Sequence, residues 1–177
     1  MEKERSASIV EDSNGNKVVL IKDLRFRGKK KEDWKVIEEY LKQYVGEFYE
    51  IVESSEIIYI SSDFPDEYAN SNSRIKLKGP VAKAKANAVL GIPELIQIAK
   101  NGEHSNNNKS KHSQDALYGW YRYEVRFALP VYDDMAERVI RHNTFTARML
   151  VRHAEDGKKY LYDILAIKKE TGSPLKL

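Results

Sequence analysis

Hydrophobic residues along the first half of the chain recur with the spacing of helices. Between residues 34 and 45 apolar side chains return every three or four positions, which is typical of one face of a helix, and Gly46 ends it. The Ala- and Lys-rich residues 79–88 predict a second helix. Gly91-Ile92-Pro93 breaks this pattern before a short third helix that extends to Ala99.

Short runs of β-branched and aromatic residues predict strands between these helices. Residues 17–21 follow an Asn-Gly-Asn turn signal, and residues 48–52 and 56–60 flank two serines as the arms of a hairpin do. Residues 64–68 predict a turn or short helix, and the turn-forming residues 70–73 predict a loop.

Three long strand-like stretches dominate the second half. Residues 101–115 contain no hydrophobic residue and therefore predict a mobile loop. The strands predicted after it are residues 118–131, 138–153 and 158–169, with an Asp-Gly hairpin signal before the last. The length of 177 residues predicts one domain, residues 1–177.

Alternation along these strands separates an apolar face from a polar one. Successive strand side chains point to opposite sides, so the odd positions of residues 121–131 and 145–151 predict the core. The polar face then carries Trp120, Arg122, Glu124, Arg126, His142, Thr144, Thr146, Arg148 and Arg152. In the third strand Leu161, Leu165 and Ile167 share a face with Asp163, and apolar residues on both faces indicate a central strand.

The polar face has two interpretations. If the strands form an antiparallel meander, its four arginines make one basic surface interleaved with Thr and Trp, which suits the backbone of RNA. The alternative is a solvated face of cross-strand ion pairs, each contributing at most about 1 kcal/mol.

Composition excludes several classes of function. The 177 residues contain no Cys, which excludes disulfides, thiolate metal sites and a cysteine nucleophile. No segment approaches the roughly 18 consecutive apolar residues of a membrane span, and the first fifteen residues contain no apolar signal region, so we expect a cytoplasmic protein. Neither a phosphate-binding Gly-rich loop nor metal-ligand spacing occurs, so we expect no cofactor and no metal.

The net charge of +3 is divided unevenly along the chain. Residues 1–70 carry 11 Lys and Arg against 16 Asp and Glu, whereas residues 71–177 carry 19 against 11. A basic, aromatic C-terminal part favours a polyanion such as nucleic acid, and a merely solvated basic face is the alternative.

Motifs in this basic part resemble a known family. They are residues 119–123 (Gly-Trp-Tyr-Arg-Tyr), 126–131, 148–153, 160–164 (Tyr-Leu-Tyr-Asp-Ile) and 167–171. These motifs are similar to the large-polyvalent-protein-associated domains of phages and integrative elements, which are grouped with the barnase, EndoU, colicin and RelE-like ribonuclease fold. Upstream stretches share the resemblance, so it covers most of the chain.

The resemblance implies an α+β fold, in which N-terminal strands and helices pack on a C-terminal antiparallel sheet. It also implies a metal-independent ribonuclease site on that sheet. Such enzymes activate the 2′-OH against the adjacent phosphate, which requires a base, an acid and a cation. His112 or Glu124 would be the base, and His112 the acid where Glu124 is the base. The implied catalytic residues are His112, Glu124, Lys168, Tyr162 and Thr171, and the implied RNA- or phosphate-binding residues are Trp120, Arg122, Arg126, Arg148, Arg152 and Lys111.

A small member of this family suggests a toxin-like or anti-defence effector of a phage or mobile element, acting in the cytoplasm of the host cell. The chain also resembles the type II anti-CRISPR proteins that truncate the guide RNA of Cas9. The expected partner is therefore RNA, including guide RNA bound to Cas9, and no membrane. The alternative is a non-catalytic inhibitor or nucleic-acid-binding module that blocks a host defence protein.

Overall fold

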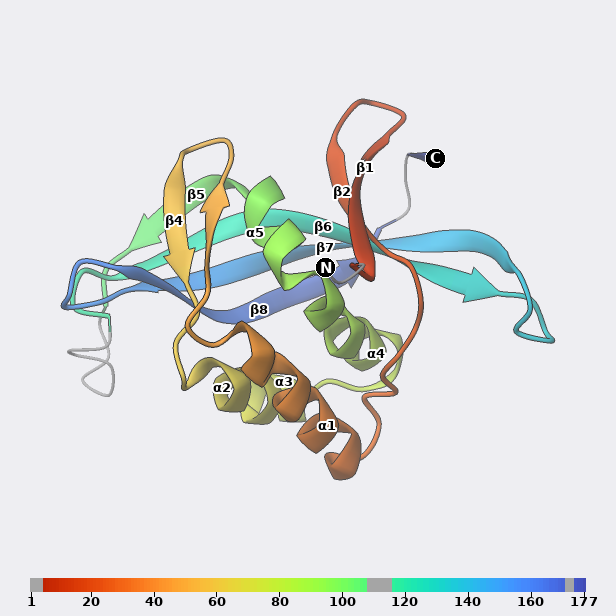
Figure 1. Ribbon diagram of the computed structural model, residues 1–177, viewed down its shortest axis with the longest axis horizontal. Helices are drawn as coiled ribbons and strands as arrows, with labels where there is room; N and C mark the ends of the chain where they lie inside the picture. The colour runs from red at the N-terminus through yellow and green to blue at the C-terminus, as the bar shows by residue number, and fades with distance from the viewer. Residues whose placement is uncertain (1–4, 108–115, 171–173) are drawn as a thin grey trace.

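The chain folds as a strongly curled sheet with most of its helices gathered along one side (Figure 1). The computed structural model describes residues 5–107, 116–170 and 174–177. The strands are β1 (Ala7–Asp12), β2 (Lys17–Ile21), β3 (Phe48–Ile51), β4 (Glu56–Tyr59), β5 (Lys100–Ser105), β6 (Trp120–Tyr132), β7 (Val139–His153), β8 (Lys159–Lys169) and β9 (Leu175–Lys176). The helices are α1 (Lys31–Leu41), α2 (Phe64–Asn70), α3 (Asn72–Ile75), α4 (Gly79–Ala88) and α5 (Ile92–Ile98), with short 3-10 turns at Lys42–Tyr44 and Val89–Gly91.

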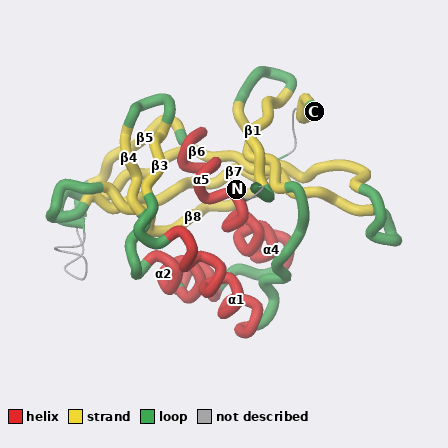
Figure 2. Tube along the Cα trace, viewed as in Figure 1, coloured by secondary structure: helices red, strands yellow, loops and turns green. Residues whose placement is uncertain are grey.

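The predicted meander of three long strands forms the centre of this sheet. Among the described residues the strand order is β3-β4-β8-β7-β6-β2-β1-β9, and β5 pairs with β6. Strand β7 lies antiparallel to both β6 and β8, whereas β2 joins β6 and β4 joins β8 through short parallel pairings. The α+β class is confirmed, and the N-terminal strands extend the C-terminal sheet at both sides (Figure 2).

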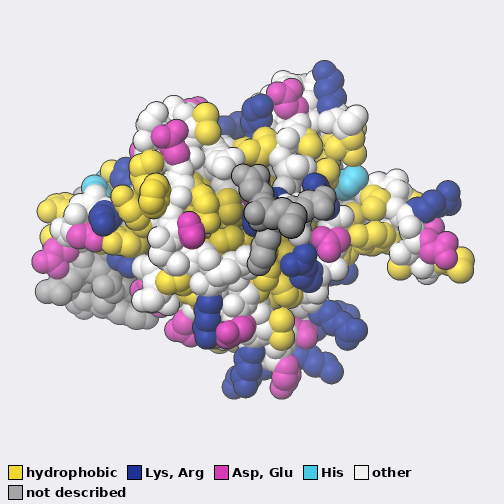
Figure 3. Space-filling view, in the orientation of Figure 1, with side chains coloured by type: hydrophobic (Ala, Val, Ile, Leu, Met, Phe, Trp, Pro, Cys, Tyr) yellow, Lys and Arg dark blue, Asp and Glu magenta, His cyan; other side chains and the backbone are white. Residues whose placement is uncertain are grey.

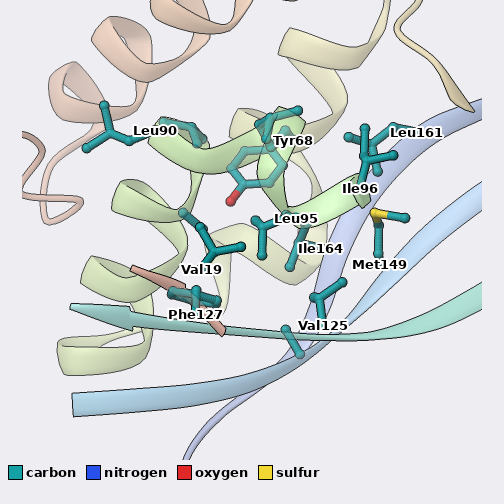
Figure 4. Packing of buried hydrophobic residues seen from close by; sticks show 14 of the residues in the cluster. Val19, Tyr68, Leu90, Leu95, Ile96, Val125, Phe127, Met149, Leu161 and Ile164 are labelled. Atoms are coloured by element: carbon teal, nitrogen blue, oxygen red, sulfur yellow. The ribbon is translucent and has the colours of Figure 1, made fainter. Parts of the chain in front are cut away.

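The apolar faces predicted from alternation form the core. Val125, Phe127 and Met149 are at most 2% exposed, and they face apolar side chains of α5 such as Leu95 and Ile96 (Figure 4). Helix α1 buries its predicted apolar face, as its periodicity requires. The opposite face of the meander is thereby left for polar side chains.

Strand β8 departs from simple alternation because its register with β7 shifts twice. Leu161 pairs with Val151 on the core side, but the irregularity that follows places Asp163 opposite Leu150, on the polar side. The prediction that Leu161 and Asp163 share a face is therefore wrong. The physical reason is a bulge, which inserts an extra residue and reverses the side to which later residues point.

Two segments predicted as loops form regular structure. Residues 101–105 belong to β5, whose side chains are exposed apart from that of Lys100, so its pairing with β6 rests on backbone hydrogen bonds instead of apolar burial. Residues 72–75 form α3, where the Ser71 hydroxyl accepts a hydrogen bond from the backbone N–H of Arg74. In the rest of the predicted loop 101–115, residues 106–107 have no regular structure, and residues 108–115 lie outside the described residues.

Candidate functional site

The polar face of the meander contains two adjacent hollows. The first, which we call the aromatic cleft, has a volume of about 580 Å³ and is lined by Asp66, Glu67, Asn70, Ser71, Asn72, Ser73, Ser105, Asn106, Asn107, Trp120, Arg122, Leu150, Tyr162, Asp163 and Leu165. The second, the basic groove, has a volume of about 730 Å³ and is lined by Asp12, Asn14, Gly15, Asn16, Lys17, Ile98, Lys100, Glu124, Val125, Arg126, Thr146, Ala147, Arg148, Ala166, Lys168 and Glu170.

Strand pairing determines which residues meet in the basic groove. Glu124 of β6 lies opposite Arg148 of β7, and Thr146 lies opposite Lys168 of β8. Lys100 of β5 pairs with Glu124 from the other side. The lining holds five Lys and Arg against three Asp and Glu, so the groove has an excess of positive charge.

Arg126 is the most firmly held cation of the basic groove. Its Nη1 donates to Asp12 Oδ2 at 2.8 Å, and its Nη2 donates to Glu170 Oε1 at 2.6 Å. The backbone N–H of Asn16 and the Arg126 guanidinium lower the pKa of Asp12 to about 2. Through these two carboxylates Arg126 joins the β1–β2 turn to the end of β8.

Glu124 is held differently, by a neutral donor. Its carboxylate accepts a hydrogen bond from the Asn101 side chain at 2.9 Å. Asn101 has a positive φ of 54° at an irregularity of β5, a conformation that Asn tolerates better than most residues. Sequence analysis missed both Asn101 and Lys100 as site residues, although the Asn-Gly pair at 101–102 is a signal for such a backbone irregularity.

Three cations beside Glu124 carry weak ion pairs or none. Arg148 contacts Glu103 at 3.4 Å, and the two side chains are 40% and 71% exposed, so this pair contributes little. Lys100 and Lys168 make no ion pair with any residue that the structure describes. The positive charges of these three side chains are therefore available to an anionic ligand.

The aromatic cleft combines two rings with polar walls. Trp120 contacts Tyr162 edge to face, with 5.0 Å between the ring centroids. Burial and a hydrogen bond to Glu67 raise the pKa of Tyr162, which keeps the phenol protonated. Arg122 donates to the Ser105 hydroxyl at 3.0 Å.

A buried ion pair lies under this cleft. Lys85 Nζ of α4 is 2.6 Å from Asp163 Oδ1 of β8, and their side chains are 1% and 3% exposed. Ser71 and Ser73 donate long hydrogen bonds of 3.4 and 3.3 Å to Asp163 Oδ2. Burial raises the pKa of Asp163 and lowers that of Lys85. Neither residue was predicted as a site residue. Lys85 is one of several lysines in its helix, so the sequence does not distinguish it.

The structure thus separates the predicted site residues. Trp120, Arg122 and Tyr162 line the aromatic cleft, whereas the basic groove holds the predicted residues Glu124, Arg126, Arg148 and Lys168. Arg152 lines neither hollow: it is 9% exposed, its guanidinium lies 4.4 Å from the Tyr160 ring centroid, and Asp63 is 3.7 Å away. His112, Lys111 and Thr171 lie outside the described residues.

The described residues form neither a candidate metal centre nor a membrane-spanning helix. Within residues 5–107, 116–170 and 174–177 no group of three or more His, Asp or Glu side chains lies close enough to hold a metal ion. No helix in the same part of the chain is long and apolar enough to span a bilayer.

No family model, curated protein or solved structure matches this chain. The resemblance to the phage and mobile-element ribonuclease domains therefore depends on the sequence motifs alone.

Proposed function

We propose that the chain is an endoribonuclease that cleaves RNA without a metal ion, with the basic groove as its site. One observation carries the proposal: the Glu124 carboxylate accepts from a neutral amide while Lys100, Arg148 and Lys168 around it are weakly paired or unpaired within the described residues. A carboxylate among available cations is the combination that phosphodiester transfer requires.

In this mechanism Glu124 accepts the proton of the ribose 2′-OH. The 2′-oxygen attacks the adjacent phosphorus, and the bond from phosphorus to the 5′-oxygen breaks, which leaves a 2′,3′-cyclic phosphate and a 5′-OH. Lys100, Arg148 and Lys168 stabilise the negative charge that develops on the phosphoryl oxygens. The leaving oxygen requires a proton, and we assign that proton to His112.

The test is cleavage of an end-labelled single-stranded RNA in the presence of EDTA. We expect the wild-type chain to cut and Glu124→Gln to lose most of the activity, while Glu137→Gln, in the exposed β6–β7 connection, serves as the matched control. Equal cleavage by Glu124→Gln and by the control would show that Glu124 is not the base. Guide RNA, with and without Cas9, is the further substrate that the family resemblance suggests.

A non-catalytic RNA-binding protein is the second candidate. It is favoured by one observation: no imidazole belongs to the described lining of the basic groove. His104 instead contacts the Tyr118 carbonyl at 2.7 Å, and His153 contacts the rings of Tyr118 and Tyr121. This candidate predicts retention of intact RNA in a gel-shift assay with no product at any enzyme concentration.

A further inference from the structure

The aromatic cleft and the basic groove are neighbours along β6. Arg122 in the aromatic cleft and Glu124 in the basic groove are two residues apart on the same face of β6. At roughly 3.3 Å per residue along a strand, their Cα atoms are about 7 Å apart. When one group of a ligand is bound in the basic groove, the group next to it in the ligand therefore reaches the aromatic cleft.

The two hollows have opposite charge character. The basic groove has an excess of Lys and Arg, but the aromatic cleft presents Asp66 and Glu67 against the single cation Arg122, since Asp163 is already paired with Lys85. A phosphate is disfavoured beside these carboxylates. Groups that donate hydrogen bonds are favoured there, because each carboxylate can accept about four.

Both carboxylates keep acceptor capacity. Asp66 accepts from the Asn70 side chain at 2.8 Å, and Glu67 accepts from the Tyr162 hydroxyl. Each of these contacts uses only part of the capacity of a carboxylate. The amide and hydroxyl groups of residues 70–73 extend the same wall with further donors and acceptors.

The aromatic side chains provide a surface on which a ring can stack. Trp120 and Tyr162 are both partly exposed and line the cleft, with Leu150 and Leu165 as apolar neighbours. Proteins that bind single-stranded RNA stack unpaired bases on such rings and read the base edges with polar groups.

We propose that the aromatic cleft is a nucleobase subsite that prefers bases carrying an exocyclic amino group. The amino group donates to Glu67 or Asp66, the ring stacks at Trp120, and the attached phosphate lies in the basic groove. The proposal deepens the ribonuclease assignment and rests on it for the identity of the ligand. Uracil is the disfavoured base, because it has no amino group.

The test uses uncleavable RNA, so that binding is measured apart from catalysis. Tetramers of adenine, cytosine and uracil nucleotides with 2′-O-methyl groups are titrated against the full chain, with fluorescence anisotropy as the readout. We expect the adenine and cytosine tetramers to bind about tenfold tighter than the uracil tetramer. Trp120→Ala should lower the affinity for them about tenfold or more, and Glu67→Gln should remove most of the preference over uracil.

Two control variants separate the subsite from general RNA affinity. Phe48→Ala removes an aromatic ring that is 59% exposed on β3 and lines neither hollow, so it should leave all three affinities unchanged. Arg148→Glu should weaken the three tetramers by equal factors, because a phosphate contact does not read the base. Circular dichroism and thermal melting confirm that each variant is folded.

The outcomes distinguish this proposal from the ribonuclease assignment. Equal affinity for the three tetramers, or unchanged affinity in a folded Trp120→Ala variant, overturns the subsite even if the wild-type chain cleaves RNA. A preference for adenine and cytosine that depends on Trp120 and Glu67 supports the subsite, including in a chain that cleaves nothing.

Discussion

Lys85 and Asp163 approach each other to 2.6 Å in the interior, although 78 residues separate them in the chain. Moving two charges out of water costs several kcal/mol, which their attraction offsets only when further hydrogen bonds complete the pair. Here the Ile164 backbone N–H, Ser71 and Ser73 provide these hydrogen bonds to Asp163. The pair therefore fixes α3 and α4 against β8, and its Asp163 belongs to the lining of the aromatic cleft.

Removing one partner of this pair should destabilise the fold strongly. Lys85→Met leaves the Asp163 carboxylate buried without its cation, so we expect the free energy of unfolding to fall by about 3–5 kcal/mol. Urea denaturation of the variant measures this loss. The double variant Lys85→Met with Asp163→Leu should recover most of it, because apolar side chains replace both charges. A double variant as unstable as Lys85→Met alone would contradict this explanation.

Asp12 should make stability depend on pH in the acid range. Its pKa is lowered from 3.8 to about 2 in the folded chain, so the carboxylate contributes stability that is complete above about pH 4 and is lost as the pH falls through 2. Asp12→Asn should lower stability at neutral pH, since the Arg126 pair is broken, and should flatten the decline between pH 4 and 2.

Urea denaturation at several pH values measures the effect of Asp12→Asn. Asp134→Asn is the matched control, because that carboxylate lies in the exposed connection between β6 and β7. The interpretation fails if stability declines equally steeply below pH 4 in both variants.

Strands with an apolar run were predictable, including the short strands β2, β3 and β4, whereas β5 was not, for a physical reason. In residues 118–131 the alternation of apolar and polar residues indicates the same buried face at many positions. Strand β6 has this pattern of burial. Strand β5 has no apolar face, so its residues carry no signal of the pairing with β6. The irregular register of β8 was equally hidden, because a bulge depends on how the strand meets its neighbour.

The candidate site was predictable only as a set of residues on one face. Alternation placed Arg122, Arg126 and Arg148 together, but it could not show that Arg126 pairs with Asp12, which is 114 residues away. Nor could it show that Asp63 and Tyr160 hold Arg152 outside both hollows. Such pairings depend on tertiary contacts between distant segments, so local patterns do not contain them.

RNA association should depend on the basic groove more than on the other basic surface of the molecule. Figure 3 shows Lys and Arg side chains gathered at the lower end, where Figure 1 places α1 and α4. The exposed lysines of this end are Lys29, Lys30, Lys31, Lys35, Lys78 and Lys83. None of them lines the basic groove or the aromatic cleft, so they provide a matched control for charge reversal.

Reversal of Arg148 and Lys168 to Glu should weaken RNA binding. It should also reduce the slope of log affinity against log salt by about 1 for each phosphate that the variant no longer neutralises. Reversal of Lys30 and Lys31 should have a smaller effect. Filter binding across a range of salt concentrations measures the affinity of each variant and its dependence on salt. Normal binding by the groove variant together with loss of binding by the α1 variant would move the RNA site to the helical end.

The last prediction concerns His112 as the general acid. In the proposed mechanism Glu124 takes one proton, and no imidazole of the described groove lining can return one to the leaving oxygen. His112 follows Lys111 and lies eight residues before the start of β6, the strand that carries Glu124. His112→Ala should lower cleavage about 100- to 10,000-fold without changing the melting temperature, and it should remove the decline of activity at high pH, where the acid is deprotonated.

His104→Ala is the matched control for this prediction. The His104 ring contacts the Tyr118 carbonyl, and the variant should keep the wild-type pH profile. If His112→Ala cleaves normally while Glu124→Gln is inactive, the proton comes from another group, and His112 is a solvated residue without a catalytic role.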